Sequence, residues 1–190
     1  DIENNEIPKV SRKLNQYFLE MIKVDEDQGS LIKKAQINPN YLIQVTGSNE
    51  KELDPSVDLN GASRRALTIA FILALTNVSE FIAPNVIDTP LGMMDPMIKK
   101  AVLTVLHRES NQLILFLTRS EIRDIENELD EYAGLVTSMI NTAHYPNKLV
   151  NNPPEQKFIS TKTCNCTHRE FCTLCEHIGD SDNPLLKYVN

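Results

Sequence analysis

The longest apolar stretch lies near the middle of the chain and follows a short polar turn. Residues 66–78 are apolar on nearly every helical face, which predicts a buried helix. The turn before it, residues 59–65, contains one glycine and two arginines but no acid. Asn60 or Ser63 would accept hydrogen bonds from the free N–H groups of the first helical turn. A helix start of this kind favours an anion such as a phosphate.

A short strand that ends in a carboxylate is predicted next. Residues 86–87 are β-branched and precede Asp88, and the sequence Thr-Pro-Leu-Gly that follows stops the strand. An acid at the carboxyl end of a parallel strand is a typical position for magnesium or substrate. Asp95, which a proline follows, predicts the N-cap of another helix.

The remaining pattern predicts an α/β layered fold with parallel strand pairs. The continuous apolar run at 112–118 favours a central strand that is covered on both faces. Lys99 and Lys100 are expected on the exposed side of their helix. The other expected elements are a loop over 23–40, strands over 41–46 and 135–142, and helices over 96–107 and 120–132.

The beginning of the chain predicts an amphipathic helix, because apolar residues recur there at helical spacing. We interpret residues 1–25 as the end of a coiled coil or as a single docking helix. Two asparagines and two prolines at 151–154 mark a boundary, so residues 26–150 form one predicted domain and residues 151–190 a tail. The periodic residues are Val10, Leu14, Tyr17, Phe18, Met21 and Ile22.

All four cysteines lie in this tail, as Cys-x-Cys followed after five residues by Cys-x-x-Cys. This arrangement supplies the four soft ligands that a structural tetrahedral zinc ion requires. Two disulfides, an iron–sulfur cluster or a redox thiol pair are the competing readings. The predicted ligands are Cys164, Cys166, Cys172 and Cys175, with His168 or His177 as an alternative to one cysteine.

Length, net charge and the lack of a long apolar run disfavour a membrane protein, a secreted protein and a general polyanion binder. The 190 residues carry a formal net charge of −7 and contain no long apolar run, so we expect a cytoplasmic protein without a membrane span or signal peptide. The same charge disfavours a general polyanion binder, so any contact with DNA needs a local basic face or another part of an assembly. No Gly-x-x-x-x-Gly-Lys-Ser/Thr phosphate-binding loop is present in the sequence.

The order of these motifs resembles the C-terminal half of an ABC-type ATPase head of the SMC, RecN and RecF kind. The phrase Ile-Asp-Thr-Pro-Leu-Gly around Asp88 is especially similar to the SMC-like D proteins of DNA phosphorothioation systems. The resemblance implies that residues 59–65 are the signature motif, Asp88 the Walker B acid that holds magnesium, and residues 91–95 the D-loop. It assigns the contacts with bound nucleotide to Asn60, Gly61, Ala62, Ser63, Arg64, Asp95 and Arg119.

Several positions depart from the family pattern. Asn60 and Ala62 replace a serine and a glycine of the signature, and Thr89 stands where the family has its catalytic glutamate. Threonine is no general base at neutral pH. No switch histidine follows the strand at 112–118. Glu121 is the candidate to orient the attacking water, since Thr89 cannot act as a base.

The resemblance implies a C-terminal part of an SMC-like ATPase that binds and hydrolyses ATP, with magnesium, between two dimerised heads. Its expected partners are a second head, the N-terminal half of the head with its Walker A loop, and DNA, in repair, maintenance or anti-phage defence. Two alternatives remain: a nucleotide-gated structural clamp with little hydrolysis, and a zinc-bearing DNA or protein adaptor.

Overall fold

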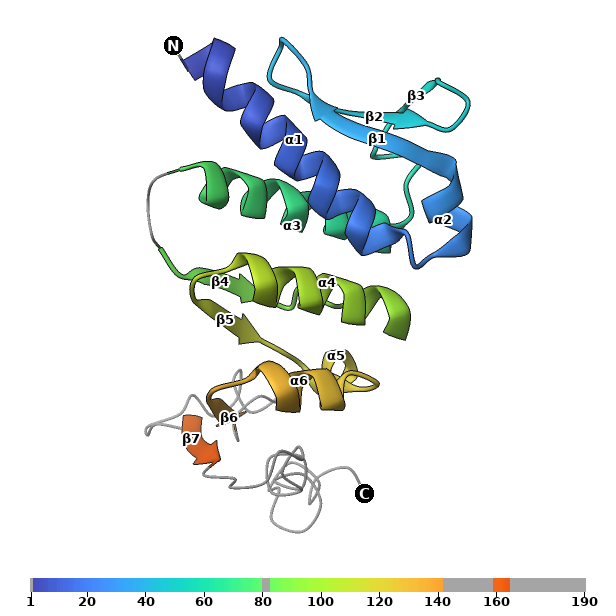
Figure 1. The fold of residues 1–190 in the computed structure, drawn as a ribbon. Helices are drawn as coiled ribbons and strands as arrows, with labels where there is room; N and C mark the ends of the chain where they lie inside the picture. Colours follow the sequence, from blue (N-terminus) through green and yellow to red (C-terminus); the bar gives the residue numbers. More distant parts are fainter. Residues whose placement is uncertain (1, 80–82, 142–158, 165–190) are drawn as a thin grey trace, which may run out of the picture. The chain divides into compact units, whose positions relative to one another are not determined.

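The computed structural model describes residues 2–79, 83–141 and 159–164, which form two compact units (Figure 1). The first unit contains residues 1–128 and the second residues 129–190. None of the described helices is both long enough and apolar enough to cross a membrane. The elements are α1 (Ile2–Ile22), α2 (Glu26–Leu31), β1 (Ile32–Ile37), β2 (Ile43–Gly47), β3 (Glu52–Leu53), α3 (Gly61–Val78), β4 (Asn85–Asp88), α4 (Pro96–Glu109), β5 (Leu113–Phe116), α5 (Arg119–Ile122), α6 (Glu126–Tyr132), β6 (Val136–Asn141) and β7 (Ile159–Cys164).

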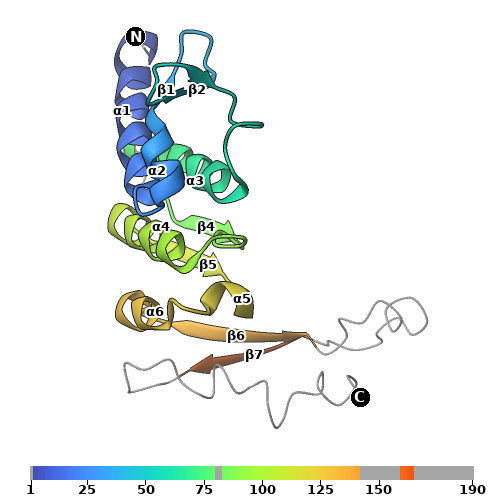
Figure 2. The ribbon, with the colours of Figure 1, turned by 90° about the vertical axis from the view of Figure 1, so that its right-hand side faces the viewer.

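The core of the first unit lies where α1 crosses α3. The predicted apolar stripe of α1 is confirmed, because all six of its residues are at most 6% exposed, and α1 packs against α3, α4 and β1 (Figures 1 and 2). The prediction that α3 is buried on nearly every face is wrong on one side. Ile72 and Leu75 remain 42% and 43% exposed, because within this chain only the other side of the helix meets α1 and α4.

The predicted loop at 23–40 instead forms α2 and the strand β1. β1 pairs in antiparallel fashion with β2, and β2 with β3, so this sheet contains none of the parallel pairs that we predicted. Side chains of α1 also bind β1: Asn15 Oδ1 accepts a hydrogen bond from the Ala35 N–H at 3.0 Å, and Ser11 Oγ from that of Ile37 at 3.0 Å. A polar strand is stable here because a neighbouring strand and a helix satisfy its backbone.

β4 and β5 form the predicted parallel pair, with Asp88 opposite Phe116 at the carboxyl end. In both ribbon views α4 lies along the pair (Figures 1 and 2). Exposure alternates along both strands, and Val86, Ile114 and Phe116 are 58%, 39% and 43% exposed. The prediction that the 112–118 strand is covered on both faces is therefore wrong as far as the described residues go, since they cover only one face.

The single helix predicted at 120–132 is broken into α5 and α6. Lys99 is buried, contrary to the prediction, and its ammonium donates hydrogen bonds to the carbonyl oxygens of Ser120 and Arg123 at 2.7 and 3.2 Å. Asp124 then has a left-handed backbone with φ 73°. Lys99 thus binds one carbonyl of α5 and the carbonyl of the residue that follows it, a position where basic groups favour the end of a helix.

The second unit contains the antiparallel pair of β6 and β7, with Val136 opposite Cys164. The strand predicted over 135–142 is confirmed as β6. β7 was missed, because its short, mostly polar sequence gains its backbone partners only from β6. The other proposed zinc ligands, Cys166, His168, Cys172, Cys175 and His177, lie outside the described residues.

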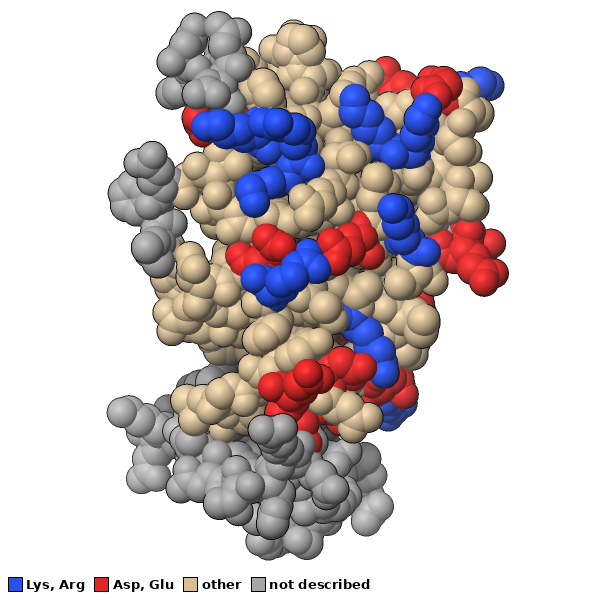
Figure 3. All heavy atoms as spheres, in the orientation of Figure 1, with Lys and Arg blue, Asp and Glu red and all other residues tan. Residues whose placement is uncertain are grey.

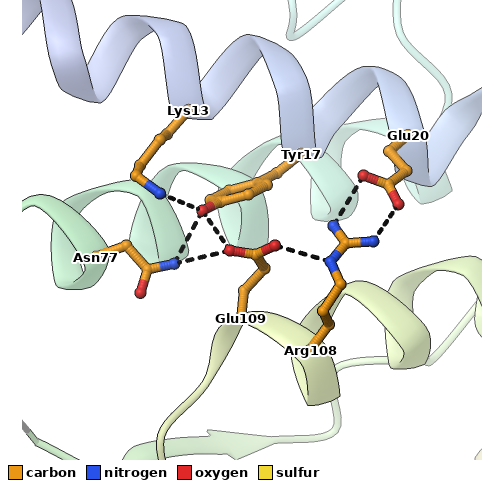
Figure 4. Close-up of polar contacts among 6 residues, drawn as sticks. All are labelled: Lys13, Tyr17, Glu20, Asn77, Arg108 and Glu109. Atoms are coloured by element: carbon orange, nitrogen blue, oxygen red, sulfur yellow. Dashed lines mark hydrogen bonds and ion pairs between the residues drawn. The ribbon is translucent and has the colours of Figure 1, made fainter.

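A chain of polar contacts joins α1 to the C-terminal ends of α3 and α4 (Figure 4). The buried hydroxyl of Tyr17 donates to Glu109 Oε2 at 2.7 Å and accepts from Lys13 Nζ and Asn77 Nδ2, both at 2.9 Å. Arg108 extends the chain from Glu109 to the carboxylate of Glu20. Because every group in it has a partner of matching polarity, the cluster orients the three helices without an unsatisfied buried hydroxyl.

The pKa values of the carboxylates reflect these contacts. Burial alone would raise the pKa of Glu109, but hydrogen bonds from Tyr17 and Arg108 outweigh it and the pKa is lowered. The hydrogen bond from Arg108 is the main cause of the lowered pKa of Glu20. Burial raises the pKa of Tyr17, so its hydroxyl stays a donor at neutral pH.

We predict that Tyr17→Phe lowers the free energy of unfolding by about 1–2 kcal/mol, because Asn77 and Glu109 lose a partner. Glu109→Gln in the same protein completes a double-mutant cycle, measured by urea unfolding. Since the two side chains are in direct contact, the cycle should return a coupling energy of about 0.5–1.5 kcal/mol. Strictly additive effects would show that the contact contributes nothing.

Candidate functional site

The polar turn begins α3 as predicted. Asn60 is the N-cap, with extended backbone angles, and its side-chain oxygen accepts from the Ser63 N–H at 2.8 Å. Ala62 and Ser63 are buried, and Ser63 Oγ has no hydrogen-bond partner among the described residues. Asn60 and Gly61 are exposed. The accessible part of the turn therefore consists of the cap, the glycine and the Arg64 side chain.

Arg64 is exposed and leans back along the chain. Its guanidinium donates to the Ser56 carbonyl oxygen at 3.0 Å. One exposed hydrogen bond to a carbonyl is weak, so the cation stays available for an anion at the turn.

Asp88 ends β4 with an exposed side chain. The next residue, Thr89, has φ 48°, and its N–H continues the sheet by donating to the Phe116 carbonyl oxygen at 2.9 Å. A β-branched residue rarely adopts this left-handed conformation. The chain therefore turns away sharply after Asp88 and leaves the carboxylate at the edge of the sheet.

Asp95 caps the next helix, as predicted. Its Oδ1 accepts from the N–H groups of Met97 and Ile98 at 2.8 and 3.1 Å, and Pro96 takes the first helical turn. The cap accounts for this carboxylate within the chain, and a contact of Asp95 with nucleotide stays a prediction.

Arg65 holds the loop between Asp88 and α4. Its Nη1 donates to the carbonyl oxygens of Thr89 at 2.9 Å and Gly92 at 3.1 Å. A Cβ atom on Gly92 would lie 2.7 Å from that Nη1. A side chain at this position would therefore have to displace the guanidinium of Arg65.

Glu121 binds the same loop, and its Oε1 would lie 3.9 Å from the Cβ that Gly92 lacks. It is 2% exposed, and its Oε1 accepts from the Leu91 N–H at 2.7 Å. Its Oε2 accepts from the N–H and hydroxyl of Thr118 at 3.0 and 2.8 Å. The Glu121 carboxylate thus makes one half of a capping box by accepting from the Thr118 N–H, and it joins the residues after β5 to the loop. A role in orienting water would require an oxygen that is free of these bonds, and it stays a prediction.

Sequence reasoning missed the contacts of both loop-holding residues. It counted both arginines in the basic turn and assigned a nucleotide contact to Arg64 alone, and it gave Arg65 no role, whereas the structure shows that Arg65 binds the loop. The Thr-x-x-Glu spacing of the capping box was a readable local signal, but the third partner, Leu91, was not. Arg119 begins α5, and its side chain lies outside the described part of the structure.

The donor set at Asp88 fits magnesium. Within the described ranges no group of three or more His, Cys, Asp or Glu side chains lies close enough to hold a metal. Magnesium needs no such cage, since it keeps several waters and commonly takes one or two carboxylates together with phosphate oxygens. One exposed carboxylate at a strand end supplies that kind of contact.

No known family model matches the chain, and no curated protein sequence is similar to it. One solved structure, a chain from work on ATP-driven dimerization and DNA-stimulated activation of SMC ATPases, has a TM-score of 0.56 and 14% identity. The match covers 92% of this chain and 94% of that one. This chain shares the fold of that SMC structure. The SMC head domain from Thermotoga maritima is also similar, with a TM-score of 0.47 and 15% identity over 74% of this chain and 46% of that one.

The SMC-like fold confirms the predicted α/β class and the coarse resemblance of the sequence. At such identities the likeness concerns the fold alone, so the roles of single residues rest on the geometry described above. The site contains two elements of that geometry: an exposed helix start at Asn60 and an exposed strand-end acid at Asp88.

We predict that Gly92→Ala lowers the free energy of unfolding by about 1–2 kcal/mol, because the new methyl group displaces Arg65 from two carbonyl oxygens. Gly61→Ala is the matched control, since a Cβ there meets no atom within 4 Å. The cost should shrink in an Arg65→Ala background. An equal cost in both backgrounds, measured by chemical unfolding, would show that Arg65 is not the obstacle.

Proposed function

We propose that the protein forms the C-terminal part of an SMC-like ATPase head, which binds ATP and magnesium between two dimerised heads. One observation carries the proposal: Asp88 lies exposed at the carboxyl end of a parallel strand pair, next to a loop held by Arg65 and Glu121. This is where open α/β sheets bind their ligands. The SMC-like fold supports the same position.

The bare face of the β4–β5 pair supports a head made of two complementary parts. Parallel sheets are almost always covered on both faces, and a lone two-stranded sheet is marginal. Val86, Ile114 and Phe116 nevertheless present exposed apolar side chains. We assign this face to the N-terminal half of the head, which would bring the Walker A loop and the remaining strands.

In this proposal each residue of the site has one task. Asp88 would hold the magnesium of an ATP bound in its own head. The Asn60–Gly61 turn and Arg64 would face the γ-phosphate of an ATP bound to the second head, where backbone N–H groups and the helix dipole favour negative charge. Each nucleotide would then be enclosed only when two heads meet, so ATP would act as the link of the dimer.

The identity of the general base separates an enzyme from a clamp. Thr89 cannot remove a proton from water at neutral pH, and both oxygens of Glu121 accept hydrogen bonds. Slow hydrolysis is therefore the expected behaviour of the enzyme. The alternative is a nucleotide-gated clamp, in which ATP closes the dimer with negligible turnover.

We predict that Asp88→Asn lowers phosphate release by about 100-fold in single-turnover assays of the assembled heads, because a metal contact contributes several kcal/mol to phosphoryl transfer. Asp27→Asn, an exposed aspartate elsewhere, should leave the rate unchanged. Tight ATP-dependent dimerisation without phosphate release would select the clamp. Absence of ATP-analogue binding to the wild-type assembly would refute both functions and favour an adaptor.

We propose that the assembled protein acts on DNA, in repair, maintenance or defence. A cluster of basic residues on α1 favours this. Basic and acidic side chains are interspersed over the face shown in Figure 3, but a basic group gathers over α1. Lys9, Arg12 and Lys13 line one shallow hollow there with Asn77 and Val78. Three cations at helical spacing on one surface form the local basic face that an acidic protein needs to contact a phosphate backbone.

The combined variant Lys9→Ala/Arg12→Ala should bind duplex DNA more weakly than wild type. Fluorescence anisotropy at several salt concentrations should also show a slope of log K against log salt that is reduced by roughly 1.8, or 0.9 for each lost phosphate contact. Lys51→Ala/Arg123→Ala removes two exposed cations elsewhere and should change neither quantity. An equal effect in both variants would remove α1 from the interface.

Zinc remains part of the proposal for the cysteine tail. Purified protein should contain about one zinc per chain, because four thiolates satisfy a structural tetrahedral site. Cys172→Ser/Cys175→Ser should lose the metal in elemental analysis. Iron with visible absorbance, or four oxidised cysteines without metal, would replace zinc with a cluster or with disulfides.

A further inference from the structure

One side chain connects the two halves of the candidate site. Arg65 lies in the first turns of α3, close in sequence to the Asn60 cap, and its guanidinium binds the loop that follows Asp88. Both hydrogen bonds go to backbone carbonyl oxygens, of Thr89 and Gly92. The start of α3 and the loop after the strand-end acid are thus joined through one guanidinium, whose two hydrogen bonds go to the backbone of that loop.

The loop needs this support because its backbone is unfavourable. Thr89 and Met93 have φ values of 48° and 64° without being glycine. Residues in such conformations persist only when their surroundings hold them in place. Leu91, which is fully buried, anchors the middle of the loop in the core, and Glu121 binds its N–H. Arg65 adds hydrogen bonds to the carbonyl oxygens of Thr89 and Gly92.

Gly92 shows how closely the guanidinium fits. The 2.7 Å that would separate Nη1 from a Cβ at this position leaves room for a hydrogen atom only. Both hydrogen bonds come from one nitrogen, Nη1, whose two N–H groups are fixed in the guanidinium plane, whereas a lysine ammonium rotates on a flexible stem. The contact therefore depends on the shape of the side chain as well as on its charge.

We propose that Arg65 is a positioning residue through which an anion at the Asn60–Gly61 turn and a magnesium ion at Asp88 strengthen each other's binding. The proposal rests on the function proposed above. An anion at the turn orders the first turn of α3 and with it Arg65, which holds the loop beside Asp88. A metal at Asp88 orders the same loop from its other end. Ligands that share the cost of ordering one element bind cooperatively, and the effect is reciprocal.

The state of the loop can be measured without any ligand. The Leu91 amide donates to Glu121, and the Thr89 amide to Phe116, so hydrogen exchange at both reports whether the loop is held. We expect at least about tenfold faster exchange in Arg65→Met, a smaller increase in Arg65→Lys, and no change in Arg123→Met, which removes an exposed arginine. Unchanged exchange in Arg65→Met would overturn the assignment of Arg65 to the loop.

Coupling itself is tested with two simple probes, Mg²⁺ and sulfate, in the same four proteins. Sulfate is titrated against the Gly61 amide resonance with and without saturating Mg²⁺. In wild type and Arg123→Met, Mg²⁺ should tighten sulfate binding by at least about fivefold, the lower end of usual coupling. In Arg65→Met the factor should fall to about one while sulfate alone still binds, with Arg65→Lys in between.

The outcomes separate this inference from the proposed function. If both probes bind the wild type but their affinities are independent, or if coupling survives in Arg65→Met, then Arg65 only stabilises the loop and the inference is wrong. If neither probe binds at the Asn60–Gly61 turn or at Asp88 in the wild type, the proposed function falls first and the coupling falls with it.

Discussion

The loop after Asp88 is the constraint on which the site depends, because its backbone is unfavourable and must be held from outside. Thr89 turns the chain with a positive φ directly after the strand-end acid. Arg65 of α3 and Glu121 of α5 both bind the loop, through three backbone groups. The position of Asp88 is therefore set jointly by the first turns of a helix that precedes it and by a carboxylate that follows it.

α3 and α4 carry the site at their N-terminal ends, and a polar cluster fixes their orientation at their C-terminal ends. α3 and α4 begin near Asn60 and Asp95 and finish at the cluster around Tyr17 and Glu109, where α1 crosses both. The cluster is fully hydrogen-bonded and surrounded by the apolar stripe of α1. A shift of α1 would move both helix ends together, since packed interiors transmit displacement rather than absorb it.

The described residues leave one face of the parallel pair uncovered. Apolar residues of β5 lie on that uncovered face. Residues 112–118 have the composition of a strand covered twice, yet Ile114 and Phe116 remain accessible. The apolar composition of this strand and its exposed side chains are consistent with each other if, in the assembled head, a complementary part covers this face. The proposed two-part ATPase head thus follows from the residues of β4 and β5 as much as from the SMC-like fold.

The sequence alone determined the features that rest on near neighbours. The caps at Asn60 and Asp95 bind N–H groups at most three residues away, the stripe of α1 repeats with the helical period, and the strand stops at Asp88 because turn residues follow. Only the tertiary structure decided the orientation of Arg65, which reaches carbonyls 24 and 27 residues along the chain, and the third partner of Glu121, 30 residues away. It also decided that Lys99 is buried and ends α5, and that polar β1 is a strand. These outcomes depend on groups far apart in sequence, and no local pattern records which distant groups meet.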